Sequence, residues 1–210
     1  MHYRLIRYYT FIIFMLFIFP SQVTSQVSIS KGIKFGLNIA KFTGDDAEGS
    51  ENLTGLVVGG HLRFGAGFLS IQPELLFTRK GVKTNDIEEG TEIKIKNNYL
   101  EIPVLIRLGF GHSPSLKPSL FAGPFASLLV SSRGLTTFGG GQSSIEVDAN
   151  HLFKEFELGF VIGAGIDFTL GFRTLLFEVR YSGGLSSIDD SGDDGDIKNS
   201  VISIMGGLAF

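Results

Sequence analysis

The chain has 210 residues, of which 43% are hydrophobic and only 19% are charged, and it contains no cysteine. This length favours one or two domains, and the apolar composition excludes an intrinsically disordered chain. The absence of cysteine excludes a disulfide framework and any thiolate metal site. A net charge of −3 argues against a nucleic-acid partner, because such proteins need a basic binding surface.

The first 25 residues have the pattern of a secretory signal peptide. Arg4 and Arg7 precede an apolar run over residues 11–19, and a proline and small polar residues follow it. A membrane-spanning helix needs about 20 apolar residues, so this run is too short to be an anchor. We therefore predict cleavage after Ser25 and an exported domain over residues 26–210.

The exported part of the chain alternates large apolar residues with small or polar ones in seven segments. These segments are residues 33–40, 56–64, 69–78, 100–108, 156–168, 175–182 and 202–210. Alternation with a period of two is typical of a strand whose two faces differ, and no stretch shows a helical repeat. An eighth segment, residues 117–130, is apolar on both faces, so alternation does not assign its register. The sequence predicts an all-β fold of eight strands.

Short and long connections alternate between these segments. Residues 65–68, 109–115 and 169–172 are short and contain glycine or proline. The long polar connections are residues 41–53, 80–97, 131–153 and 186–199. Antiparallel strands with short turns at one end and long loops at the other are typical of an outer-membrane barrel, and strands of about ten residues can cross a bilayer. We predict an eight-stranded antiparallel up-and-down transmembrane β-barrel.

Alternation does not by itself show whether the apolar face points inward or outward. A water-soluble lipocalin is the alternative, with the apolar face lining its interior. The seven alternating segments carry roughly thirty large apolar side chains, which would overfill an eight-stranded barrel, because its interior is just wide enough to be filled by side chains or to hold one small ligand. The apolar face therefore points outward, where lipid covers it.

The same registers direct ten ionisable side chains into the lumen. These are Lys34, His61, Arg63, Glu74, Glu101, Arg107, Glu157, Asp167, Glu178 and Arg180. Because acids and bases are nearly balanced, and an isolated charge in a dry interior costs several kcal/mol, we predict a plug of salt bridges. A proton or ion path and a small-ligand site are the functional alternatives. We expect no general pore, because aqueous channels need about 16 strands.

Two loops carry residue types that serve in hydrolytic or metal sites. Ser143, Ser144, Glu146, Asp148 and His151 include the types of a Ser-His-acid hydrolase, but no nucleophile motif surrounds the serines, and we predict no enzyme. The acidic loop over residues 189–196 fails the EF-hand pattern, which requires glycine at position 6 and glutamate at position 12. Its acids are Asp189, Asp190, Asp193, Asp194 and Asp196. We read it as a solvated loop and predict no metal and no cofactor.

Glycines 139–141 do not follow a strand that leads into a helix, so they do not indicate a phosphate-binding loop. Two of the four histidines also fall outside these clusters and the lumen: His2 lies in the predicted signal peptide and His112 in a short turn. Neither position suggests a catalytic or metal-binding role.

Six segments together resemble the PorT-like outer-membrane β-barrel family. They are Ile33–Asn38, Leu69–Gly81, Tyr99–Leu105, Phe121–Phe125, Gly163–Asp167 and Phe177–Ser182. The resemblance implies an integral protein of the bacterial outer membrane in a family whose founding member is associated with export of proteins to the cell surface, and it carries no catalytic motif. Phe210 is similar to the terminal aromatic residue by which the outer-membrane assembly machinery recognises barrels.

These observations lead to one main functional hypothesis and two alternatives. The main hypothesis is a closed, non-enzymatic barrel with a structural or interaction role, accessory to protein secretion or envelope assembly. Its expected partners are outer-membrane lipids, the assembly machinery during insertion, and envelope or secretion proteins that contact the long loops. The alternatives are a narrow transporter or channel for small solutes and an outer-leaflet lipid hydrolase.

Overall fold

The computed structural model describes residues 28–44, 51–86, 91–111, 115–138, 143–190 and 196–210. The strands are β1 Ser28–Thr43, β2 Glu51–Ala66, β3 Leu69–Asp86, β4 Thr91–Gly109, β5 Leu116–Phe138, β6 Ser143–Asp148, β7 Phe156–Leu170, β8 Arg173–Gly184 and β9 Lys198–Ala209, with a 3-10 turn η1 over Asn150–Leu152. The described part of the chain contains no helix that is long and apolar enough to cross a membrane. The predicted signal peptide lies outside the described residues.

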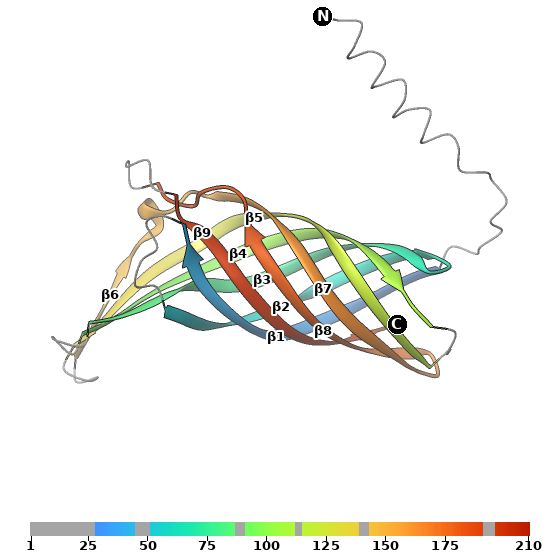
Figure 1. The fold of residues 1–210 in the computed structure, drawn as a ribbon. Helices are drawn as coiled ribbons and strands as arrows, with labels where there is room; N and C mark the ends of the chain where they lie inside the picture. The colour runs from blue at the N-terminus through green and yellow to red at the C-terminus, as the bar shows by residue number, and fades with distance from the viewer. Residues whose placement is uncertain (1–27, 45–50, 87–90, 112–114, 139–142, 191–195) are drawn as a thin grey trace, which may run out of the picture.

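Eight of the nine strands close into an antiparallel barrel, as the sequence predicts (Figure 1). Sequential neighbours pair along the chain, the first strand β1 pairs with the last strand β9, and β4 pairs with β5. The remaining strand, β6, lies outside the barrel wall. It pairs with residues 133–138 of β5, beyond the residues of β5 that pair with β7. A closed barrel satisfies the backbone hydrogen bonds of its strands without an open edge, which a structure in hydrocarbon requires.

Two of the predicted short connections, residues 65–68 and 169–172, form tight turns at one end of the barrel. Gly67 and Gly171 occupy the first turn positions with φ of 65° and 63°, and phenylalanine follows each of them. Glycine with positive φ at the first of two turn residues is the requirement of a type II′ hairpin, whose twist matches that of the strands. In outer-membrane barrels short turns mark the periplasmic end, so the opposite end faces outside the cell.

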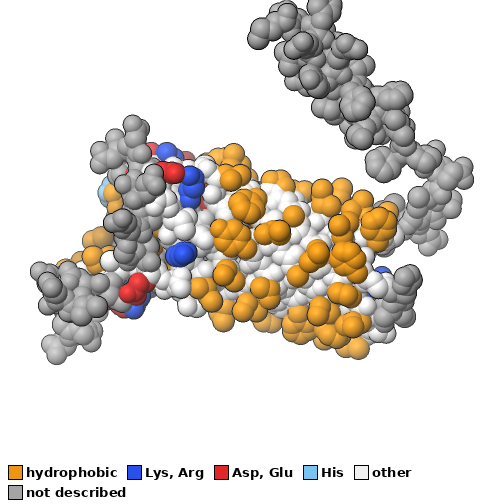
Figure 2. Space-filling view, viewed as in Figure 1, with side chains coloured by type: hydrophobic (Ala, Val, Ile, Leu, Met, Phe, Trp, Pro, Cys, Tyr) orange, Lys and Arg blue, Asp and Glu red, His pale blue; other side chains and the backbone are white. Residues whose placement is uncertain are grey.

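The apolar face points outward, which excludes the lipocalin alternative. Phe35, Val104 and Phe177 are 65%, 41% and 54% exposed, and apolar side chains cover the wall of the barrel (Figure 2). On β1 the outward residues Ile33, Phe35, Leu37 and Ile39 lie between Lys31 and Lys41, and Ile29 precedes Lys31. Ten strand residues span about 34 Å, or about 26 Å along the membrane normal at a tilt of about 40°, which matches the apolar band of about 25 Å in such barrels.

The structure assigns the register of β5, which the sequence does not. Phe121 and Phe125 point into the lumen and are 3% and 2% exposed. Each lies opposite a glycine of β7, Phe121 opposite Gly163 and Phe125 opposite Gly159. A Cβ atom at Gly163 would lie 2.6 Å from the Phe121 ring, so the ring occupies space that a side chain on β7 would need. Both faces of this segment are apolar because its luminal face carries these two rings.

Replacing Gly159 with valine is expected to destabilise the barrel by about 1–3 kcal/mol, because the new side chain would clash with the Phe125 ring and with the backbone of Gly183. Urea titration of the variant in phospholipid vesicles, followed by heat-modifiable gel migration, measures this loss. Gly206→Ala is the matched control, since a Cβ there would have its nearest neighbours at 3.9 Å. Equal stability of the two variants would contradict this packing.

Two of the four predicted long loops are largely strand, so this part of the prediction is wrong. β3 and β4 extend as a hairpin to Asp86 and from Thr91, and β5 continues to Phe138 and pairs with β6. These four strands form a sheet that projects beyond the barrel at the extracellular end (Figure 1). The alternation of Ile93 and Ile95 with Lys94 and Lys96 is the sequence signal for this extension.

Candidate functional site

The centre of the lumen contains a buried network of ion pairs from β1, β3, β4 and β8. The Lys34 ammonium lies 2.5 Å from Glu74 Oε1 and 2.7 Å from Glu178 Oε2. Arg180 Nη1 donates to the other oxygen of Glu74 at 2.7 Å, and Arg107 pairs with Glu178. None of the five side chains is more than 2% exposed, so each carboxylate is neutralised without contact with water.

Toward the periplasmic end the network continues through Asp167 on β7. Arg63 Nη1 lies 2.5 Å from Asp167 Oδ2, and Arg107 Nη1 lies 3.5 Å from Asp167 Oδ1. Arg107 also donates to the Ser119 hydroxyl at 3.0 Å, and Arg63 Nε donates to Gln72 at 2.6 Å. Arg63 is the most exposed member of this group, with 16% of its side chain accessible.

Toward the extracellular end a second cluster forms around Lys80. Its ammonium lies 2.7 Å from Glu101 and 3.0 Å from Glu157, and it stands over the rings of Phe125 and Tyr99 at 4.5 and 5.1 Å. Charged and aromatic partners together compensate for the loss of water around a buried ammonium. The sequence predicts a loop at Lys80, but in the structure this residue continues the luminal alternation of β3.

All ten predicted luminal residues line the interior. One of them, His61, is buried, and neither of its ring nitrogens has a hydrogen-bond partner in the described structure. With Lys80 added, the ion pairs of the lumen join five cations to five carboxylates. Lys34, Lys80, Arg107, Arg180 and Glu157 are at most 2% exposed. A continuous aqueous channel through this level would leave these side chains hydrated, so the centre of the lumen is plugged.

An apolar cluster lies inside the extracellular end of the barrel. Phe153, from the connection before β7, packs against the inward-facing Phe42 with ring centroids 5.9 Å apart. Ile188, from the connection after β8, and Val82 of β3 belong to the same buried cluster. Lys154 N donates to the Ile188 carbonyl at 2.8 Å and joins the two connections. Side chains therefore block the lumen above the ion pairs as well.

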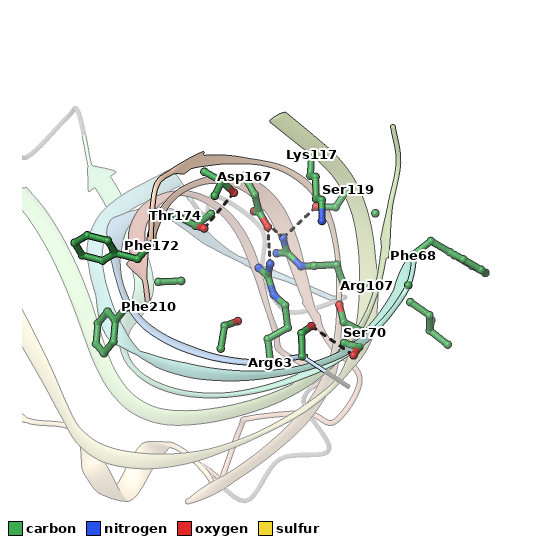
Figure 3. A pocket seen from close by; sticks show the side chains of 18 residues that line it. Arg63, Phe68, Ser70, Arg107, Lys117, Ser119, Asp167, Phe172, Thr174 and Phe210 are labelled. Carbon is green, nitrogen blue, oxygen red and sulfur yellow. Dashed lines mark hydrogen bonds and ion pairs between the residues drawn. The ribbon is translucent and has the colours of Figure 1, made fainter. Parts of the chain in front are cut away.

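The periplasmic end is hollow. A cavity of about 300 Å³ opens among the ends of the strands, with Arg63, Arg107 and Asp167 in its wall and Lys117 and Ser119 beside them (Figure 3). Phe68, Phe172 and Phe210 also line it. We call this cavity the periplasmic vestibule. In the part of the chain that the structure describes, this cavity opens at the periplasmic end, whereas the apolar cluster fills the lumen at the extracellular end.

The extracellular sheet of β3 to β6 has two different faces. Ile93, Ile145 and Val147 are 42%, 56% and 54% exposed, and their pairing through β5 places them on one face. The opposite face carries ion pairs, including Lys83–Glu92 at 2.8 Å and Arg133–Glu146 at 2.8 Å. The hydrogen bond from Lys83 lowers the pKa of the Glu92 carboxyl and raises the pKa of the Lys83 ammonium. In the described residues β6 pairs on one side only, with β5.

The residues considered for a hydrolase do not form a triad in the described structure. Glu146 accepts from Arg133 at 2.8 Å, and Asp148 accepts from the backbone and side-chain nitrogens of Asn150 at 2.9 and 3.1 Å. No hydrogen bond in the described residues joins His151 to Ser144 or to either acid. The side chain of Ser143 lies outside the described residues. Both acids are therefore engaged away from His151.

The acidic loop shows no metal-binding arrangement in the part that is described. Asp190 uses its backbone N–H to donate to Leu152 at 3.0 Å, Asp189 forms a bridge with Phe153, and Asp196 pairs with Lys198 at 2.6 Å. Among the described residues no group of three His, Asp or Glu side chains could hold a metal ion. Asp193, Asp194, His2, His112 and glycines 139–141 lie outside the described residues.

Comparison with solved structures finds outer-membrane barrels. Neisserial surface protein A is 15% identical, with coverage of 87% of this chain and 97% of that chain and a TM-score of 0.47. OprG from Pseudomonas aeruginosa is 15% identical, with coverage of 90% and 99% and a TM-score of 0.45. The outer membrane protease OmpT from Escherichia coli is 10% identical, with coverage of 89% and 97% and a TM-score of 0.45. The absence of enzymatic activity stays a prediction.

No curated protein matches the chain. The narrower resemblance to PorT-like barrels likewise stays a prediction. The broader assignment is direct, since residues 21–190 match the family described as "Outer membrane protein beta-barrel domain". The closed antiparallel barrel and its outward apolar band are the structure that this description requires. The chain therefore belongs to this family of β-barrel proteins of the bacterial outer membrane.

Proposed function

We propose that the protein is a closed, non-enzymatic outer-membrane barrel with a structural or interaction role, and that it presents the extracellular sheet of β3 to β6 to a protein partner. The observation that carries the proposal is the burial of the luminal ion pairs, in which no cation of the central network exceeds 2% exposure. A filled lumen keeps the barrel wall rigid and leaves no path for solutes. We therefore assign the function to the surfaces of the protein outside the membrane.

The extracellular sheet supports the choice of a protein partner. Its exposed apolar face carries Ile93, Ile145 and Val147. Exposure of apolar surface to water is unfavourable by roughly 25 cal/mol per Å², so a partner that covers this face gains binding free energy. The free side of β6 in the described structure offers backbone groups to an extended segment of another chain. The ion pairs on the opposite face keep that side soluble. By analogy with the PorT resemblance, the partner is a protein of secretion or envelope assembly at the cell surface.

The position of Phe210 beside the β1–β9 seam supports recognition by the assembly machinery. Phe210 exchanges backbone hydrogen bonds with Lys31 at 2.9 and 3.1 Å, next to the seam between β1 and β9. Its ring is 56% exposed and lies under the Lys31 ammonium at 5.5 Å. An accessible aromatic ring beside the closing seam is suitably placed to be bound before the barrel closes.

Purified protein in planar lipid bilayers is expected to give no single-channel conductance, because the ion pairs and the apolar cluster fill the lumen. A 16-stranded porin in the same bilayer is the control for detection, since barrels of that size leave an aqueous channel. Stable, voltage-independent conductance steps would overturn the closed-barrel proposal and support the transporter alternative.

A photo-crosslinking amino acid at position 145 is expected to capture a discrete protein in intact cells, and Val147→Lys is expected to abolish that adduct. Val147 shares the apolar face with residue 145, so a charge there disrupts binding without altering the barrel. The same crosslinker at position 35, which faces lipid, is the matched control. Equal capture at both positions, or capture unaffected by Val147→Lys, would argue against a docking sheet.

A further inference from the structure

We propose that the periplasmic vestibule is a binding site for a small anionic solute that carries carboxylate or phosphate groups. The cavity has about 300 Å³ of space and lies at the end with short turns. At about 30 Å³ for each water molecule, this space holds about ten waters, or one molecule the size of citrate or a sugar phosphate. The proposal goes beyond the role of the extracellular sheet, at the opposite end of the barrel.

Half of the residues that line the vestibule carry hydrogen-bond donors in their side chains. Arg63 and Lys117 provide cationic groups, and serine and threonine hydroxyls surround them (Figure 3). These hydroxyl residues are Ser28, Ser30, Ser70, Ser119, Thr169 and Thr174. Arg63 Nη2 has no hydrogen-bond partner in the described structure, while its Nη1 and Nε are engaged by Asp167 and Gln72. The guanidinium is thus fixed in orientation, with one donor nitrogen buried and unpaired.

The charged side chains of the vestibule wall are mostly cationic. Among the described residues, those that line the cavity are Arg63, Arg107, Lys117 and Asp167. Asp167 is the single acid of the group, and Arg63 and Arg107 already share it. Lys117 lies opposite Asp167 in the β5–β7 ladder but forms no ion pair with a described carboxylate. A concave site with an uncompensated cation concentrates anions from the surrounding water.

The vestibule is closed on the side that faces the centre of the lumen. Behind Arg63 and Asp167 lies Arg107, whose pairing with Glu178 connects it to the fully buried central network. A bound anion therefore meets cations and hydroxyls at the mouth and carboxylates of the network deeper in the lumen. These carboxylates repel an anionic solute that moves deeper into the lumen. The arrangement therefore favours binding at the mouth over passage through the barrel.

The test uses the folded, isotope-labelled protein in nanodiscs of phosphatidylcholine, titrated with citrate and, separately, with inorganic phosphate. Saturable shifts are expected in the backbone amide signals of Ser119, Asp167 and Thr169, and not in those of β6 at the other end. A charge-assisted hydrogen bond contributes enough that Lys117→Gln is expected to weaken binding about tenfold. Lys154→Gln, an exposed lysine at the extracellular end, is the matched control and keeps wild-type affinity.

Lys117→Arg is expected to retain binding, which separates the charge from the identity of the residue. Nanodiscs that contain phosphatidylglycerol distinguish the source of the anion: if lipid headgroups occupy the vestibule, the same amides shift without added solute, and the free-solute proposal is overturned. The proposal also fails if neither anion gives saturation, if sodium chloride at equal ionic strength gives the same shifts, or if Lys117→Gln binds as tightly as Lys154→Gln.

Discussion

Replacing Lys34 with methionine is expected to reduce the free energy of unfolding by about 3–5 kcal/mol, the cost of breaking a buried ion pair by removing one partner. Lys34 neutralises Glu74 and Glu178, both of which are buried, at 2.5 and 2.7 Å. Without the ammonium, Glu74 keeps Arg180 and Glu178 keeps Arg107, but the two carboxylate oxygens that faced Lys34 lose their charged donor in a site that water does not reach. Urea titration in phospholipid vesicles, with the folded fraction measured by heat-modifiable migration, gives the change directly.

The double variant Lys34→Met, Glu178→Gln is expected to recover part of that loss. Glu178→Gln removes one of the two carboxylates that lose the Lys34 ammonium, while Glu74 keeps Arg180 at 2.7 Å and Arg107 keeps Asp167 at 3.5 Å. Lys154→Met is the control, because this lysine is exposed and most surface substitutions change stability by at most about 0.5 kcal/mol. A Lys34→Met protein as stable as Lys154→Met would show that the luminal pairs contribute nothing to stability.

The side-chain network could be foreseen because a strand has a strict period of two. Once Phe35 and Leu37 are placed on the lipid face, Lys34 must face the lumen, and the same holds for Glu178 between Phe177 and Val179. Near-balance of acids and bases then predicts pairing. The partners of each charge could not be foreseen, since they depend on the stagger between strands such as β3 and β8, which are not neighbours in the barrel.

The predictions fail where a local sequence pattern is compatible with two structures. The register of β5 was ambiguous because Phe121 and Phe125 are luminal, and only the facing glycines Gly163 and Gly159 on β7 make room for them. Lys80 was misplaced because a polar stretch after an apolar strand resembles a loop. In the structure this stretch continues as strand beyond the membrane, where cross-strand pairs such as Lys83–Glu92 replace lipid contacts.

Replacing Phe35 with arginine is expected to destabilise the folded barrel by about 2–4 kcal/mol, the cost of a cationic side chain on the lipid face at the bilayer midplane. Phe35 is 65% exposed and lies near the middle of the outward apolar residues of β1, which run from Ile29 to Ile39. The backbone there is fully paired with β2 and β9, so the substitution leaves the hydrogen bonds in place and changes only contact with acyl chains. The same vesicle titration measures the effect.

Phe172→Arg provides the matched control for depth. Phe172 is 85% exposed at the β7–β8 turn, next to Gly171, and a cation near the interface costs only about 0–1 kcal/mol. A difference between the two variants therefore reports the position of the side chain in the bilayer and not the loss of a phenylalanine. In short-chain detergent, which adapts its thickness to the protein, the difference should shrink. If Phe35→Arg instead folds with unchanged stability in vesicles, the outward face does not meet hydrocarbon, and the assignment of the apolar band to the membrane is wrong.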